Sequence, residues 1–140
     1  MLTNNEYNAE FRCISLSIQV RIGNSSMPGV EKLFLKYGVD IYLNGHDHIY
    51  ERILPMNDGK IQRGKKGDYI DPNGMVHLTT GSAGCYLNTP PMNPTPPEYN
   101  VMLSREFSYT RLRAYNRTHL SLTQIKKSPV SNEFFNFIIP

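Results

Sequence analysis

A short apolar strand that ends in a cluster of polar residues constrains this chain more than any other feature. Residues 39–43, Val-Asp-Ile-Tyr-Leu, are rich in β-branched and aromatic side chains and predict a strand. The sequence Asn-Gly-His-Asp-His follows directly at residues 44–48. In α/β proteins, polar residues at the C-terminal end of a strand that follows a helix commonly form the active site. We therefore predict a functional loop at residues 44–48.

A helix is predicted immediately before this strand. Pro28 suits the first turn of a helix, where its missing N–H is not needed, and Gly38 is suited to end the helix in a left-handed conformation. Between them, apolar residues recur at helical spacing and form one stripe: Val30, Leu33, Phe34 and Tyr37. The pattern predicts one clear helix near residues 28–37. Further upstream, apolar and polar residues alternate from Ile14 to Ile22, which predicts a half-buried strand.

Beyond residue 48 the sequence favours strands and loops. Residues 75–80 predict a strand that leads into a turn of small residues at 81–84. Two further β-prone segments, 107–115 and 119–125, are joined by Asn-Arg and predict a hairpin. Asn-Asp-Gly at 57–59 predicts a turn, residues 64–73 predict an irregular segment, and the five prolines within residues 89–97 predict an exposed loop. The apolar run at 134–139 needs a partner surface.

Composition and charge exclude several classes of protein. A chain of 140 residues with 39% hydrophobic residues is long and apolar enough for one domain with a core. Its densest basic stretch, Arg63 with Lys65 and Lys66, is followed at once by Asp68 and predicts a solvated loop, so we expect no nucleic-acid partner. No apolar run is long enough to span a bilayer, so we expect no membrane partner. The polar, acidic N-terminus lacks the features of a signal peptide.

The cysteines and the sequons leave alternatives open. Cys13 and Cys85 are too few for a disulfide framework, and they either pair or stay free. Two Asn-x-Ser/Thr sequons make Asn24 and Asn116 candidates for N-glycosylation, which matters only in a secretory protein.

The only cluster with metal-ligand character is His46-Asp47-His48. Neutral imidazole is a good ligand for zinc and iron, and two histidines two positions apart can reach one metal site when the backbone is extended or turning. Two ligands are too few, however, because an open catalytic zinc site usually takes three protein ligands. His77 and His119 lie in predicted strands without a patterned carboxylate or cysteine, and we interpret both as structural.

A longer pattern surrounds this cluster. Residues 36–52 read Lys-Tyr-Gly-Val-Asp-Ile-Tyr-Leu-Asn-Gly-His-Asp-His-Ile-Tyr-Glu-Arg. This run resembles the last metal-binding motif of the purple acid phosphatases, which has the form Gly-His-x-His-x-Tyr-Glu-Arg, within the metallophosphoesterase superfamily. The resemblance continues in order through residues 80–85, 107–112 and 116–120, and covers most of the chain from about Arg21 to Gln124.

The resemblance implies an α/β fold, a partial αββα metallophosphoesterase sandwich made mostly of β-strands with the one helix. It implies an acid phosphatase that hydrolyses phosphomonoesters at a binuclear centre of Fe(III) with Zn(II), Fe(II) or Mn(II). By position, His46 resembles a ligand of the divalent metal and His48 a ligand of the ferric ion. Four neighbours resemble residues that orient ligands or pair strands: Asp47, Tyr50, Glu51 and Arg52. The family's usual location is secreted or lysosomal.

The chain also departs from the family. The upstream motifs Asp-x-Gly, Gly-Asp-x-x-Tyr and Gly-Asn-His-Glu/Asp are not found before His46, so no bridging carboxylate is available. We expect at most one weakly held metal and no activity from this chain by itself. Residues 1–20 do not match the family, and we favour an incorrect gene model over a genuine strand there. Residues 21–127 are predicted to be the C-terminal part of the catalytic domain, and 128–140 a tail.

Two interpretations of function follow. The first is a fragment of a phosphatase whose partner is its missing N-terminal half. The alternative is a noncatalytic binding module, or pseudoenzyme, that retains the C-terminal fold and pairs with a full-length relative.

Overall fold

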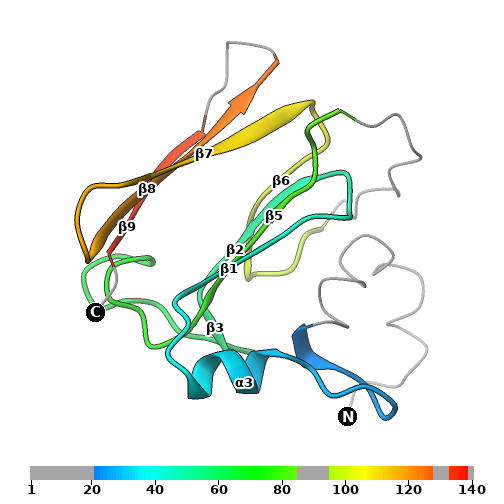
Figure 1. Cartoon of the computed structure of the whole chain (residues 1–140), viewed down its shortest axis with the longest axis vertical. Helices are drawn as coiled ribbons and strands as arrows, with labels where there is room; N and C mark the ends of the chain where they lie inside the picture. The colour runs from blue at the N-terminus through cyan, green and yellow to red at the C-terminus, as the bar shows by residue number, and fades with distance from the viewer. Residues whose placement is uncertain (1–20, 85–94, 128–132, 139–140) are drawn as a thin grey trace.

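In the computed structural model, residues 21–84, 95–127 and 133–138 are described, and they form two larger β-sheets, a small two-stranded sheet and the short helix α3 (Figure 1). The first sheet has the strand order β1-β5-β2-β6, in which β1 and β5 run parallel and the other pairs antiparallel. Its strands are β1 (Ile41–Asn44), β2 (Tyr50–Ile53), β5 (Val76–Thr80) and β6 (Asn100–Ser104). The second sheet is antiparallel, in the order β7 (Ser108–Ala114), β8 (His119–Lys126) and β9 (Glu133–Ile138).

The core lies between the two sheets. Strand residues alternate between the faces of a sheet, and the inner face of β5 carries Val76 and Leu78, which are almost completely buried. Leu122 of β8 packs with them, so the second sheet covers the inner face of the first. Tyr50 and Tyr69 complete this cluster, and the Tyr69 hydroxyl donates a hydrogen bond to the Ile53 carbonyl at 3.2 Å.

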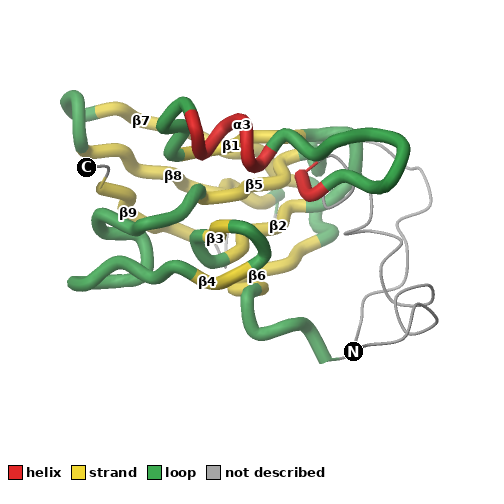
Figure 2. The backbone as a smooth tube through the Cα atoms, turned by 90° about the horizontal axis from the view of Figure 1, so that it is seen from below, coloured by secondary structure: helices red, strands yellow, loops and turns green. Residues whose placement is uncertain are grey.

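Helix α3 (Glu31–Lys36) lies on the outer face of the four-stranded sheet, over β1 (Figure 2). Phe34 contacts Tyr42 with ring centroids 5.4 Å apart, and Tyr42 in turn contacts His77, its register partner on β5. The order of layers is therefore helix, sheet, sheet. This arrangement, mostly strands with one short helix, confirms the predicted fold class. Within the described residues no helix is long and apolar enough to cross a membrane.

The helix differs from its prediction in two respects. It begins at Glu31 rather than at Pro28, because Pro28 instead forms an isolated β-bridge with Gly23. The predicted apolar stripe is also largely uncovered, since Leu33 is 52% and Tyr37 71% exposed. The end of the helix is as predicted, with Gly38 in the left-handed conformation at a φ of 67°.

Most strand predictions are confirmed within one or two residues. The 57–59 turn connects β3 (Met56–Asn57) to β4 (Lys60–Ile61), with positive φ at Asp58 and Gly59. The 107–125 hairpin and the strand at 75–80 are present as β7–β8 and β5. The 134–139 run, which had no assigned element, supplies β9 against β8.

The predicted strand from Ile14 to Ile22 is wrong at its C-terminal end. Arg21 and Ile22 are helical, and Ile22 is 53% exposed. The rest of that strand, Cys13 and Cys85 lie outside the described residues, as does most of the proline-rich loop.

Candidate metal centre

The loop that carries His46 and His48 is placed by the parallel pair β1 and β5. Both strands run in the same direction, so the loop after Asn44 and the turn after Thr80 emerge at the same edge of the sheet. The Thr79 hydroxyl donates to the Asn44 side-chain oxygen at 3.1 Å and ties the two strand ends together. His46 adopts a φ of 74°, a left-handed conformation that is uncommon for a residue other than glycine and that turns the chain sharply out of β1.

Gly81 holds this loop by close backbone contact. Its N–H donates to the Ile49 carbonyl at 2.9 Å, and the Ile49 N–H donates to the Asp47 carbonyl at 2.8 Å. A Cβ atom at position 81 would lie 1.9 Å from the Asp47 carbonyl oxygen. Only glycine permits this approach, which explains the glycine directly after β5.

The two candidate ligands, His46 and His48, differ in exposure. His46 is exposed and His48 is half-buried. Neither imidazole has a hydrogen bond or an ion pair to a described residue. Asp47, between them, is half-buried; burial raises the pKa of its carboxyl, and the two neighbouring imidazoles oppose that change.

The donor set is too small for the binuclear centre that the resemblance implies. Among the residues that the structure describes, no three His, Cys, Asp or Glu side chains gather closely enough to hold a metal ion. An open catalytic site needs about three protein ligands, and two adjacent cations need a bridging carboxylate as well. The described residues therefore fit at most part of such a centre, and by themselves they do not provide for a catalytic step at a metal.

Strand β2 carries the three other residues of the motif into the interior. Tyr50 is 1% exposed and belongs to the core cluster. Arg52 lies over the Tyr69 ring, with 5.1 Å between its guanidinium carbon and the ring centroid. Glu51 is buried on the outer face and accepts a hydrogen bond from the Asn100 side-chain amide at 2.7 Å. Burial, reinforced by the charge of Asp47, raises the pKa of Glu51 to about 7.

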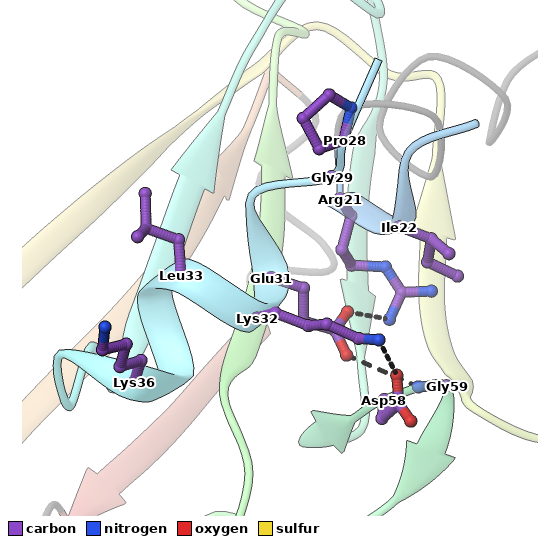
Figure 3. A pocket seen from close by; sticks show the side chains of 10 residues that line it. All are labelled: Arg21, Ile22, Pro28, Gly29, Glu31, Lys32, Leu33, Lys36, Asp58 and Gly59. Atoms are coloured by element: carbon purple, nitrogen blue, oxygen red, sulfur yellow. Dashed lines mark hydrogen bonds and ion pairs between the residues drawn. The ribbon is translucent and has the colours of Figure 1, made fainter. Parts of the chain in front are cut away.

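A buried ion pair beneath α3 was not predicted from the sequence. Arg21 Nη1 donates to Glu31 Oε2 at 3.0 Å, and the two side chains are only 5% and 4% exposed (Figure 3). The Gly59 N–H donates to the other carboxylate oxygen at 3.4 Å. Glu31 thus joins three segments that are distant in sequence. A charge at the first position of a short helix gives no sequence signal of burial, so only the fold reveals this pair.

His77 is buried and has a carboxylate neighbour that the sequence pattern did not indicate. Its Nε2 lies 3.9 Å from Glu31 Oε2 and makes no hydrogen bond to a described residue. Burial, reinforced by Arg21, lowers the pKa of His77 to about 3. The imidazole is therefore neutral at neutral pH, and this contact is not an ion pair. His119 is exposed on the β7–β8 hairpin, where its Nδ1 contacts the Thr118 hydroxyl at 2.8 Å.

A cavity of about 570 Å³ lies beside α3 and the β3–β4 turn. Figure 3 shows the residues that line it, among them Lys32, Lys36, Asp58 and the Arg21–Glu31 pair. No residue of the 44–48 loop lines this cavity, so it is separate from the candidate metal ligands.

Known proteins resemble this chain in sequence and in fold. Residues 74–134 match the sequence profile of the family described as iron/zinc purple acid phosphatase-like protein C. Acid phosphatase type 7 from Danio rerio is 39% identical over 118 residues, and its Homo sapiens counterpart is 37% identical over 115. Probable inactive purple acid phosphatase 24 from Arabidopsis thaliana is 30% identical over 111 residues. A solved structure of a purple acid phosphatase from yellow lupin (Lupinus luteus) seeds has a TM-score of 0.69 with 24% identity and covers 83% of this chain, which supports the fold alone.

The fold and the sequence define a member of the purple acid phosphatase class. The chain belongs to that family and corresponds to its C-terminal portion. The similarity to the two acid phosphatase type 7 proteins extends over 81% of this chain, but over only 27% and 26% of those proteins. It includes 18% of the Arabidopsis protein and 20% of the lupin chain. The chain thus spans about a quarter or less of the length of these relatives.

Proposed function

We propose that this chain supplies the last metal-ligand loop of an acid phosphatase that hydrolyses phosphomonoesters, and that the activity belongs to a longer protein. The observation that carries the proposal is the loop itself. His46 and His48 follow the end of β1, and neither imidazole has a hydrogen bond or an ion pair to a described residue. Gly81 packs against the Asp47 carbonyl between them and donates a hydrogen bond to the Ile49 carbonyl. By the family resemblance, the divalent metal and the ferric ion would orient the phosphate and activate a bound water.

His46 is proposed as a ligand of the divalent metal (Zn(II), Fe(II) or Mn(II)) and His48 as a ligand of Fe(III). Asp47 and Glu51 are proposed to orient the loop rather than to bind metal. Tyr50 and Arg52 are proposed to hold β2 between its two neighbours. The remaining ligands are expected from outside this chain.

Exposed apolar side chains on α3 and β1 support a missing partner. Leu33 and Tyr37 on α3 are 52% and 71% exposed, and Leu43, which pairs with Leu78 on the inner face of the sheet, is 44% exposed. Among the described strands β1 is also an edge strand, and an edge presents unpaired backbone groups to a neighbour. We propose that further chain of the same protein, or a full-length relative, covers these residues.

The test uses the natural gene product, whatever its length, and the 140-residue chain side by side. We measure bound iron, zinc and manganese and the hydrolysis of p-nitrophenyl phosphate at acidic pH. The longer product is expected to hold metal and hydrolyse the ester, and His46→Ala or His48→Ala is expected to lower activity by more than about 100-fold. His119→Ala, another exposed histidine, is the matched control. Full activity in the His46→Ala protein would refute the assignment.

A noncatalytic role is the second candidate. It is favoured by the relatives that are named inactive purple acid phosphatases and by the two-ligand donor set of the described residues. A natural product of 140 residues that is folded, metal-free and inactive is the result expected for this alternative.

Secretion is proposed on the family resemblance and on the two sequons. Asn24 and Asn116 are both exposed, and both side-chain oxygens accept hydrogen bonds from backbone N–H groups in tight turns. In a eukaryotic secretory host, Asn24→Gln and Asn116→Gln are each expected to remove one endoglycosidase-sensitive mass increment. An unmodified secreted protein would contradict this.

A further inference from the structure

We propose that the free edge of β7 is a docking site for an acidic peptide segment in extended conformation. The proposal rests on the C-terminal half of this strand and the residue that follows it, residues 111–115. Among the described strands, β7 pairs only with β8 and is the edge of the three-stranded sheet. An edge strand presents a row of backbone donors and acceptors that another strand can pair with.

The hydrogen-bond pattern shows which backbone groups are open. The Tyr115 N–H donates to the His119 carbonyl at 2.9 Å, toward β8. N–H groups alternate in direction along an antiparallel strand, so those of Leu112 and Ala114 point away from β8. The same alternation agrees with Ser108, whose N–H donates to the Ser82 carbonyl at 3.0 Å on the outer side. The edge is therefore closed at residue 108, while Leu112 and Ala114 donate to no described backbone carbonyl.

The side chains on this strand define the chemistry of the partner. Tyr109, Arg111, Arg113 and Tyr115 occupy every second position and share the face turned away from the core. The two tyrosines are 50% and 56% exposed, and both arginines are exposed. This alternation of aromatic and basic residues is a feature that our interpretation of the basic stretches in the sequence missed.

The tyrosines hold the guanidinium groups in place, and no described carboxylate pairs with them. Arg111 Nη2 donates to the Tyr109 hydroxyl at 3.4 Å, and the Arg113 guanidinium carbon lies 5.4 Å from the centroid of the Tyr115 ring. By contrast, Arg63 in the basic loop already pairs with Asp68 at 2.7 Å. In the described part of the chain, Arg111 and Arg113 therefore form a positively charged pair that can receive carboxylates.

The charge of Arg111 and Arg113 also indicates which kind of molecule binds the β7 edge. A second copy of this edge would bring Arg111 and Arg113 against the same residues, and like charges on neighbouring strands destabilise a sheet. A strand with carboxylates at alternate positions avoids this repulsion and satisfies the open N–H groups. A nucleic-acid strand would satisfy the arginines but not the backbone groups, so the peptide is favoured.

The probe is a fluorescein-labelled octapeptide of alternating Thr and Glu, titrated with the protein and followed by fluorescence anisotropy. The expected result is saturable binding that weakens about tenfold in the Arg111→Glu/Arg113→Glu protein, because two ion pairs become repulsive. The control is the Lys65→Glu/Lys66→Glu protein, in which two exposed loop residues change and the net charge changes by the same amount. It is expected to bind the peptide with the affinity of the parent protein. A peptide with Lys in place of Glu is expected not to bind.

A second measurement isolates the backbone contribution without altering the protein. An octapeptide that is N-methylated at alternate residues, on the edge that faces β7, is expected to lose at least about tenfold in affinity. Methylation of the opposite edge is expected to have little effect.

Four results overturn the proposal: no binding of the acidic peptide, equal weakening by the Lys65/Lys66 variant, equal binding of both methylated peptides, or tighter binding of an oligothymidine of matched length. If the natural product is longer than this chain, slow hydrogen exchange at the Leu112 amide without peptide also overturns it, because the edge would already be covered.

Discussion

Replacement of Gly81 by alanine tests the contact that positions the candidate ligand loop. In the structure, the new Cβ would lie 1.9 Å from the Asp47 carbonyl oxygen and 2.9 Å from the carbonyl carbon. Ordinary contacts to such atoms are no closer than about 3.4 Å, so the two loops must separate by more than an ångström. Because the opposing atoms belong to the backbone, a side-chain rotation cannot relieve the clash.

The cost has two sources. Overpacking costs roughly 1–3 kcal/mol, and the shift strains the hydrogen bond from Gly81 N–H to Ile49, which contributes roughly 1 kcal/mol. We expect Gly81→Ala to lower the free energy of unfolding by about 3 kcal/mol, which corresponds to a melting temperature lower by roughly 10 °C. Thermal unfolding followed by circular dichroism measures this directly.

Gly45→Ala is the matched control. Gly45 belongs to the same loop, has no positive φ and would place its Cβ in open space. We expect its melting temperature to stay within about 2 °C of the parent, because alanine restricts the unfolded chain without a clash. If the Gly81→Ala and Gly45→Ala proteins have the same melting temperature, the two loops do not approach each other as closely as described.

Three further perturbations test the interior. Leu122 is the buried side chain of the second sheet in the described core cluster. Leu122→Ala should lower the free energy of unfolding in urea by about 2–5 kcal/mol. Glu31→Gln leaves Arg21 buried without a counter-charge and should cost about 3–5 kcal/mol by the same measurement. Glu51→Gln should change the pH dependence of stability. The folded pKa of Glu51, about 7, exceeds its ordinary value of 4.5, so the folded state binds the extra proton between these values. The Glu51 contribution to stability is therefore full below about pH 4.5 and declines as pH rises to about 7, and the variant should lose this decline.

The first two perturbations have matched control variants, and the third has an outcome that would contradict it. Leu112→Ala, at a residue 45% exposed, should cost less than about 1 kcal/mol, and an effect equal to that of Leu122 would argue against the sheet-to-sheet core. Lys32→Ala, in the same helix with an exposed side chain, should change little. Parallel pH profiles for the parent and the Glu51 variant would show that this carboxyl does not titrate differently in the folded state.

The sequence predicted the local elements because their signals are local. Gly38 ends α3 with a positive φ, and Asn-Asp-Gly makes the β3–β4 turn, because each conformation depends on the residue itself and its neighbours. The apolar stripe of α3 was misleading for the same reason. Leu33 and Tyr37 are patterned for burial, but no described segment covers them.

Some features of the candidate site were likewise predictable from the sequence, and others were not. The motif identified His46 and His48 as candidates and the end of β1 as their position, since strand, turn and ligand spacing are contiguous. The contact between Gly81 and Asp47 joins two loops that are far apart in sequence and was not predictable. Nor was the central place of β2, between β5 and β6, which buries Glu51 and raises its pKa.

By itself, therefore, the sequence determined the helix, the strands β1 and β5, the β7–β8 hairpin, the family and the two candidate imidazole ligands, but not the strands β2 and β6. Only the tertiary structure decided which strands are edges, which charges are buried and how many candidate ligands meet among the described residues. The physical reason is distance along the chain. Dihedral preferences and turn chemistry act over a few residues, whereas burial and strand pairing depend on segments that approach only after folding: the Arg21–Glu31 pair under α3, the Leu122 contact between sheets, and the open edge of β7 beside Arg111 and Arg113.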